Sequence, residues 1–225
     1  MIVIGFGHYS RTGKDSVANY FLECLSEYKS SMRAIKRSLA WKLKQTCFEL
    51  YSWAGVMPPE HYETKEGEKD RELFLPDLQM TVVELWVAFG TKAVRNNVYG
   101  ATWLDYLLKT DHQCDVLLIP DVRFPNEADA IKAMGGLIIK VVRPGYGPRK
   151  TVADRALLGY DGWDYVIGAE GTMDSLRHWA SRFACHVAGS KIISVQTAAE
   201  RKVALSVENI EPWEPDRLSP KLWYT

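Results

Sequence analysis

The stretch that decides the fold is MIVIGFGHYSRTGKDSVANY, residues 1–20 of a 225-residue chain. The apolar run at residues 2–4 predicts a buried strand, and apolar residues at helical spacing from Ser16 to Cys24 predict a helix. Between them lies a polar loop with glycines at positions 5, 7 and 13, and Lys14 follows the last of these. A helix N-terminus presents unpaired N–H groups and a partial positive charge. This order of strand, loop and helix therefore predicts a phosphate-binding loop, or P-loop.

The loop departs from the usual pattern G-x-x-x-x-G-K-[S/T] at three positions. Five residues separate Gly7 from Gly13, His8 stands where a glycine is expected, and Asp15 stands in the Ser/Thr position. Because a carboxylate is a hard oxygen ligand, we expect Asp15 to hold Mg²⁺ directly or through water. The alternative is an ordinary strand–helix turn with an N-cap Asp or Ser. The residues predicted to bind the donor phosphates here are Ser10, Arg11, Thr12, Gly13, Lys14, Asp15 and Ser16.

Composition excludes several classes of protein. Lys and Arg together number 28, as do Asp and Glu, so no global basic field favours nucleic-acid binding. No apolar run approaches the roughly 18–20 residues that span a bilayer, and we expect no membrane association. The four cysteines form no C-x-x-C pair, which argues against a zinc site or a disulfide framework and fits a reducing cytoplasm.

A second informative stretch runs from residue 115 to residue 127. Val116 to Ile119 is a continuous apolar run, typical of a central parallel strand, and Asp121 follows it. Ligands of open α/β sheets collect at the carboxyl ends of strands, so Asp121 is predicted to organise Mg²⁺. A helix from about residue 126 to residue 134 and a strand at residues 137–142 complete a right-handed βαβ unit.

The middle of the chain predicts helices at residues 33–53, 81–94 and 102–109, with a capping box at Thr81 and Glu84. Lys44 lies off the apolar stripe of the first helix, either as a solvated charge or facing a substrate phosphate. The highly charged residues 60–72 predict an irregular, mobile surface segment, either a lid or a plain solvated loop.

A Gly/Pro-rich basic segment follows residue 142. Arg143, Arg149, Lys150 and Arg155 are predicted to face transferring phosphates, although a basic loop can also be merely solvated. Further on, the pattern predicts a strand at residues 165–167 and a helix at residues 173–188. Two β-like runs at residues 192–195 and 203–207 precede a tail with two tryptophans.

Four blocks in this order resemble the deoxynucleoside monophosphate kinases of bacteriophages, a branch of the P-loop nucleoside monophosphate kinases. The blocks are Gly13-Lys14-Asp15-Ser16, Phe89-Gly90-Thr91 to Arg95 with Trp103, Asp121 to Glu127 with Gly135-Gly136, and Val142-Arg143-Pro144 with Asp164 to Thr172. They cover about residues 1–180. Ala153-Asp154-Arg155-Ala156 stands near the place where many relatives carry His-x-Ser-Glu.

The resemblance implies transfer of the ATP γ-phosphoryl group to a deoxynucleoside monophosphate with Mg²⁺. Lys14, Arg11, Arg123 and Arg143 would be catalytic, with Arg149 and Arg155 on the donor side and Asp15 and Asp121 on the metal. The residues implied for the acceptor are Lys44, Thr91, Arg95, Trp103, Arg123 and Glu127. Two of these have structural alternatives, since Trp103 is at core spacing and Arg123 is four residues from Glu127.

The predicted fold is an α/β three-layer P-loop fold with a central, mostly parallel sheet. Residues 1–190 would form the kinase core, with a helical acceptor part at 33–110 and a lid-like segment at 143–163. Residues 191–225 would form a hairpin and tail on the core or on a second subunit, which leaves a homodimer open. We expect a cytoplasmic enzyme, in the host cytoplasm if the chain is phage-encoded. The alternatives are another P-loop small-molecule kinase, of the phosphomevalonate or dephospho-coenzyme A type, or a nucleotide-dependent switch.

Overall fold

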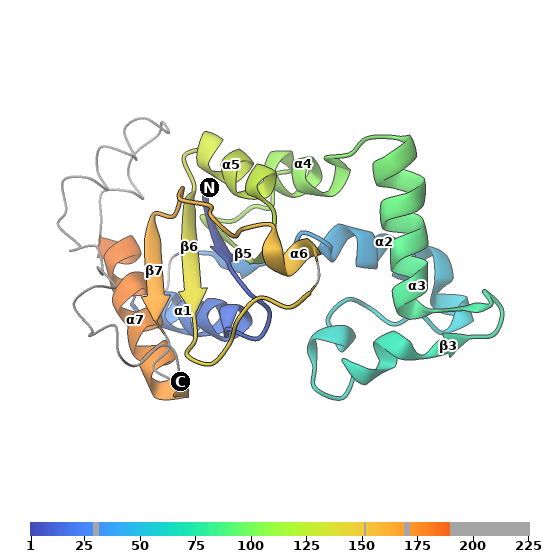
Figure 1. Ribbon diagram of the computed structural model, residues 1–225, viewed down its shortest axis with the longest axis horizontal. Helices are drawn as coiled ribbons and strands as arrows, with labels where there is room; N and C mark the ends of the chain where they lie inside the picture. The colour runs from blue at the N-terminus through green and yellow to red at the C-terminus, as the bar shows by residue number, and fades with distance from the viewer. Residues whose placement is uncertain (29–31, 151, 169–171, 190–225) are drawn as a thin grey trace. The chain divides into compact units, whose positions relative to one another are not determined.

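The computed structural model describes residues 1–28, 32–150, 152–168 and 172–189. The chain divides into two compact units (Figure 1). Unit 1 combines Met1–Arg37 with the chain from Asp111 onward, and unit 2 is Ser38–Thr110. The predicted hairpin and tail at residues 191–225 lie outside the described residues. In the part of the chain that is described, no helix has both the length and the apolar character needed to cross a membrane.

Unit 1 is built on a parallel sheet of five strands in the order β2-β5-β1-β6-β7. The strands are β1 (Ile2–Gly7), β2 (Ala34–Lys36), β5 (Val116–Val122), β6 (Leu137–Val142) and β7 (Tyr165–Gly168). The apolar run of β1 is buried along its whole length, as expected for the middle strand of a sheet that is covered on both faces. The predicted α/β fold with a parallel sheet is confirmed.

Helices cover both faces of this sheet. Ile4 and Phe6 of β1 belong to the core cluster that includes Phe21 of α1 (Lys14–Tyr28) and Phe183 of α7 (Met173–Gly189). On the other face, a Cβ at Gly5 would lie 3.0 Å from Ile131 of α5 (Pro125–Ala133). Alternate residues of β1 therefore serve opposite layers. Figure 1 shows β6 and β7 pointing the same way, with α7 beside β7.

The carboxyl end of β5 is irregular, and this irregularity bears on Asp121. Gly5 pairs with Ile119 and Gly7 pairs with Val122, so β5 has one more residue than β1 over this interval. Pro120, which has no N–H to give to a ladder, lies within it. Such a bulge changes the direction of side chains. Asp121 belongs to the strand rather than to the loop after it.

Unit 2 is mainly helical. Its elements are α2 (Trp41–Tyr51), the 3₁₀ turns η1 (Ser52–Ala54), η2 (His61–Glu63) and η3 (Lys69–Glu72), the hairpin β3 (Phe74–Leu75) and β4 (Met80–Thr81), α3 (Val82–Trp86), the π-helix η4 (Val87–Arg95) and α4 (Thr102–Lys109). Its core gathers around Leu43, Cys47, Tyr62, Leu75 and Val82. The capping box at Thr81 and Glu84 is confirmed, with both reciprocal hydrogen bonds formed.

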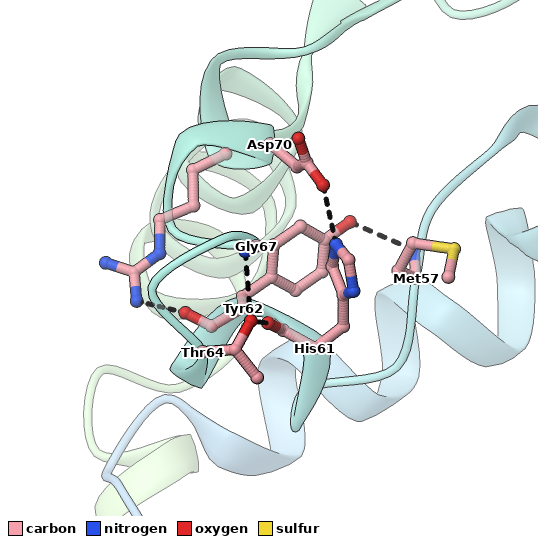
Figure 2. Close-up of polar contacts among 7 residues, drawn as sticks. Met57, His61, Tyr62, Thr64, Gly67 and Asp70 are labelled. Atoms are coloured by element: carbon pink, nitrogen blue, oxygen red, sulfur yellow. Dashed lines mark hydrogen bonds and ion pairs between the residues drawn. The ribbon is translucent and has the colours of Figure 1, made fainter.

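The charged residues 60–72 lie largely on the surface, as predicted, but they fold around a buried residue that their composition did not indicate, and the lid role stays a prediction. Tyr62 is only 1% exposed, and its hydroxyl accepts a hydrogen bond from the Met57 N–H at 2.9 Å. Around it, His61 pairs with Asp70 at 2.7 Å, and Arg71 donates to the Tyr62 carbonyl (Figure 2). Polar groups of this segment form hydrogen bonds with one another around the buried Tyr62 ring. The charged composition of the segment gave no sign that Tyr62 is buried.

The single helix predicted at residues 33–53 was also wrong. Residues 34–36 form the edge strand β2 beside β5, and the Arg37 N–H donates to the Leu118 carbonyl. The sheet edge therefore overrides the helical pattern of this stretch, and α2 begins only at Trp41.

The helix predicted at residues 81–94 changes character at residue 87, where the π-helix η4 begins. Gly90 is buried there, and a Cβ at this position would lie 2.4 Å from Leu43 Cδ2, so only glycine fits without a shift of that side chain. The Gly90 carbonyl accepts a hydrogen bond from Trp103 Nε1 at 3.1 Å. Helices of this kind are rare and are frequent at functional sites.

Candidate phosphate-binding site

The connection from β1 to α1 forms a tight loop with unusual backbone geometry. His8, Arg11 and Gly13 have positive φ values of 109°, 64° and 97°. Such values suit glycine and cost other residues roughly 1–3 kcal/mol each. The position where the motif expects glycine therefore does take a glycine-like conformation, although His8 occupies it. Thr12 is fully buried and donates its hydroxyl to the Tyr9 carbonyl at 3.0 Å.

Lys14 opens α1 and turns back over the loop. Its Nζ donates to the His8 carbonyl at 3.1 Å and also to the Tyr9 carbonyl. Burial, and next the Arg123 guanidinium, lower the pKa of Lys14 to about 8, while three carboxylates oppose the shift. These are Asp15, Asp154 and Asp121. Lys14 is therefore a half-buried ammonium whose charge is disfavoured by burial, and a phosphate group bound beside it would favour the charged form.

The first-turn N–H groups of α1 are further candidates for contact with an anion. Ser16 lies in that turn, and the Val17 N–H is the donor that closes it on the Gly13 carbonyl. The N–H groups before Val17 have no acceptor within the helix, by the geometry of any α-helix. The partial positive charge of the helix N-terminus acts in the same direction as Lys14.

The two carboxylates predicted for Mg²⁺ both lie within electrostatic reach of Lys14. Asp15 is exposed and pairs with Lys36 Nζ at 3.8 Å, and Asp121 is partly buried at the end of β5. Within the residues described, no group of three or more His, Cys, Asp or Glu side chains could hold a metal. Mg²⁺ commonly takes only one or two protein carboxylates together with waters and substrate phosphates, so this pair fits it.

Arg123 and Glu127 take different roles at the start of α5. The Glu127 carboxylate accepts from the backbone N–H groups of Arg123, at 2.8 Å, and of Phe124, at 3.1 Å. Glu127 therefore caps the helix, and the contact that it makes with Arg123 is to the main chain. The Arg123 side chain is exposed, and its charge acts on both Lys14 and Asp154.

The basic segment after β6 folds back on the loop through Asp154. The Asp154 carboxylate accepts from the Ser10 N–H at 3.2 Å, the Ser10 hydroxyl at 2.5 Å and the Arg149 N–H at 3.2 Å. Arg155 Nε donates to the Arg149 carbonyl at 3.3 Å, and both of these arginines are exposed. Arg143 lies over the Tyr146 ring, 4.5 Å from its centroid.

Four predicted acceptor residues lie in unit 2. Thr91 and Arg95 are on η4, both exposed, and Arg95 Nε donates to the Gly100 carbonyl at 3.3 Å. Trp103 is half-buried beside Phe89, with 6.4 Å between ring centroids, and bonds to Gly90. Lys44 lies over the Trp86 ring at 5.2 Å. The structure thus gives Trp103 a packing role within unit 2.

Three charged residues near the loop were not among the predicted site residues. They are Asp154, Lys36 next to Asp15, and Lys140 of β6, whose charge helps burial to lower the pKa of His8 to about 4. Lys140 lies two residues before the carboxyl end of β6, so the rule that selected Asp121 could have indicated it, whereas Lys36 gave no such signal because a helix was predicted at its position. Asp154 gave no such signal, because it comes from a short helix, α6 (Val152–Arg155), that the sequence pattern did not predict.

Comparisons with known proteins identify the family of the chain. The family described as "Deoxynucleotide monophosphate kinase" matches residues 61–179, just over half of the chain and including Asp121, Arg123 and Asp154. A protein of Acanthamoeba polyphaga mimivirus, named "Putative deoxynucleotide monophosphate kinase", is 29% identical over 175 residues, covering 72% of this chain and 86% of that protein. The deoxynucleotide monophosphate kinase of Enterobacteria phage T4 is 37% identical over 103 residues, 44% of this chain and 43% of that protein. The chain belongs to the deoxynucleotide monophosphate kinase family.

Proposed function

We propose that the protein transfers the γ-phosphoryl group of ATP to a deoxynucleoside monophosphate, giving the diphosphate and ADP, with Mg²⁺ as cofactor. Membership of the family supports the reaction class and the nucleotide substrate. The observation that carries the donor side is Lys14, which is half-buried over a glycine-like loop with Asp15, Asp121 and Arg123 within electrostatic reach.

Phosphoryl transfer requires positioning and charge neutralisation more than covalent chemistry. Lys14 and the first-turn N–H groups of α1 would hold the β- and γ-phosphates of the donor. Arg11, exposed on the loop, would reach toward the γ-phosphate. Ser10, Thr12, Gly13 and Ser16 would shape the loop around the phosphates.

Asp15 and Asp121 would hold Mg²⁺, which supplies neutralisation of charge on the phosphate oxygens. Asp15 is exposed and its pair with Lys36 at 3.8 Å is loose, so its carboxylate can exchange that partner for a new one. Asp121 is held by the strand, so its carboxylate needs little ordering.

Arginines would stabilise the transferring group and the acceptor. Arg123 is exposed beside the loop and would act as a bidentate fork on a phosphate, as would Arg95 in unit 2. Arg143, Arg149 and Arg155 would add charge on the donor side. Thr91, Trp103, Lys44 and Glu127 stay predictions for the acceptor, and Glu127 would have to combine that role with its helix cap.

The test is a screen of the four deoxynucleoside monophosphates with ATP and Mg²⁺, measuring ADP release and the diphosphate product. We expect one or more of them to stimulate ADP release and to become phosphorylated. ATP hydrolysis that no acceptor changes would contradict the proposal and favour a nucleotide-dependent switch. A cytoplasmic location and the absence of nucleic-acid binding are further expectations, checked by fractionation and electrophoretic mobility shift. Sedimentation distinguishes the two open alternatives of a monomer and a homodimer.

A further inference from the structure

Asp154 is an ionisable residue in an unusual position. Among the described residues, Asp154 is the buried side chain that carries a carboxylate, and it is 5% exposed. A buried carboxylate is costly unless hydrogen bonds and opposite charges compensate it. Asp154 has both kinds of compensation, and both come from the phosphate-binding loop and its surroundings.

The hydrogen bonds of Asp154 join two segments that are 144 residues apart. One carboxylate oxygen accepts from the N–H and the hydroxyl of Ser10, and the other accepts from the Arg149 N–H. Burial alone would raise the pKa of this carboxyl group, but these bonds and the Arg123 guanidinium more than offset it and keep the pKa below its usual value. Asp154 is therefore held as the anion.

The strained part of the loop surrounds Ser10. His8, two residues before it, and Arg11, directly after it, both have positive φ. Non-glycine residues keep such conformations only where surrounding contacts impose them. The N–H and the hydroxyl of Ser10 both donate to the same carboxylate oxygen of Asp154. This carboxylate is therefore one of the contacts that hold the loop in its strained conformation.

We propose that Asp154 is a positioning residue that sets the conformation of the phosphate-binding loop and holds the main chain at Arg149 against it. This inference rests on the proposed function, in which the loop holds the donor nucleotide. Because Asp154 occupies the Ser10 N–H, the donor phosphates are left to Lys14 and to the N-terminus of α1. Asp154 itself would touch neither substrate.

The experiment compares Asp154→Ala, Asp154→Asn, Ser10→Ala and the Ser10→Ala/Asp154→Ala double variant in the full chain. Hydrogen bonds to a charged group are the stronger ones, so Asp154→Ala should raise the KM for ATP by about 10- to 100-fold. Asp154→Asn keeps an acceptor for Ser10 and should give a rise below about 10-fold. The KM for the deoxynucleoside monophosphate should change much less than that for ATP.

The double variant separates this role from general destabilisation. If Asp154 acts through Ser10, the KM for ATP in the double variant should be no higher than in Asp154→Ala alone. Asp161→Asn is the matched control, since Asp161 is exposed in the same segment, and it should leave both KM values unchanged.

Three results would overturn the proposal. The first is an unchanged KM for ATP in Asp154→Ala, or in Ser10→Ala if the Asp154→Ala variant does not fold. The second is a lowered KM for ATP, which would mean that the carboxylate competes with the donor phosphates. The third is equal rises for ATP and for the acceptor. A wild-type protein that phosphorylates no deoxynucleotide would instead refute the proposed function, so the two failures are distinguishable.

Discussion

The phosphate-binding loop at residues 8–14 and the charged segment at residues 60–72 are both short polar connections, and they are stabilised in opposite ways. In the charged segment, hydrogen bonds join residues three to nine positions apart, around the buried Tyr62 ring (Figure 2). The loop has local hydrogen bonds of Thr12 and Lys14 as well, but Ser10 also bonds to Asp154, 144 residues away. The loop also carries the strained φ values of His8 and Arg11 and the lowered pKa of Lys14.

This difference separates a scaffold from a binding site. Most hydrogen bonds of the charged segment are made among its own residues, so its conformation does not depend on a ligand. The loop keeps an ammonium in a half-buried position that disfavours its charge, which an anionic ligand would relieve. Substitutions in the loop should therefore change activity, whereas those in the charged segment should change stability.

The largest effect is expected for Lys14→Ala. Removing one preorganised charge from a phosphoryl-transfer site costs about 10²- to 10³-fold in turnover, while the fold should persist because burial disfavours the charged form of this lysine. Steady-state kinetics and circular dichroism test both parts. Lys65→Ala, at an exposed lysine of the charged segment, is the control and should keep full turnover. Full activity in Lys14→Ala would end the assignment of the loop.

Gly13→Ala should have the next largest effect. The residue has φ of +97°, and a Cβ would lie 2.9 Å from Leu176 Cδ1, so both strain and a clash arise. We expect about 1–3 kcal/mol of lost stability and roughly 10- to 100-fold lower turnover, because the loop that positions the donor shifts. Thermal denaturation and kinetics measure these.

Alanine substitutions at two other glycines separate backbone strain from the steric clash. Gly159 has φ of +78° with open space around it, so Gly159→Ala measures the cost of strain alone. Gly147 has open space and no positive φ, and Gly147→Ala should be neutral. Equal stability of the Gly13, Gly147 and Gly159 variants would show that the loop is not strained.

Much of unit 1 could be predicted from sequence because its signals are local. The apolar runs at residues 116–119 and 137–142 are typical of buried parallel strands, and the strands β5 and β6 form there. The carboxyl-end rule then placed Asp121 near Lys14 without knowledge of the strand order. The bulge at Pro120 was not predicted, because it depends on pairing between β1 and β5.

The failures share one cause, which is tertiary context. Residues 34–36 form a strand where β5 offers an edge, and position 90 requires glycine because Leu43 packs against it. Tyr62 stands in a highly charged run, so no periodicity marked it as buried. Asp154 could not be predicted as a partner of Ser10, since nothing local to either residue indicates a contact over that separation.

Tyr62→Phe tests the charged segment. The substitution keeps the buried ring but leaves the Met57 N–H without its acceptor, which costs about 1–3 kcal/mol for a buried donor. We expect a lower midpoint in urea and unchanged turnover at a temperature where the variant is folded. Thr64→Ala is the comparison variant, since it removes a hydrogen bond of an exposed residue in the same segment and should lower stability less than Tyr62→Phe. A large fall in turnover without loss of stability would make the segment part of the site.

The smallest effect concerns His8 and the pH dependence of stability. Burial first, and then the charge of Lys140, lower the pKa of His8 to about 4, against 6.5 in an unfolded chain. Between these values the unfolded state binds a proton that the folded state does not, so stability falls as the pH falls from 6.5 to 4. After allowance for the partial exposure of the ring, the contribution is roughly 1 kcal/mol.

His8→Asn isolates this contribution, because asparagine tolerates the positive φ at this position and does not titrate there. Other groups titrate in both proteins, so the quantity to follow is the difference in free energy of unfolding between wild type and variant. That difference should shift in favour of the variant as the pH is lowered from 7 to 4. A difference that is constant over this range would mean that His8 takes up its proton as readily in the folded loop as in the unfolded chain. Burial in the loop would then not lower the pKa of His8, and the contrast with residues 60–72 would lose this support.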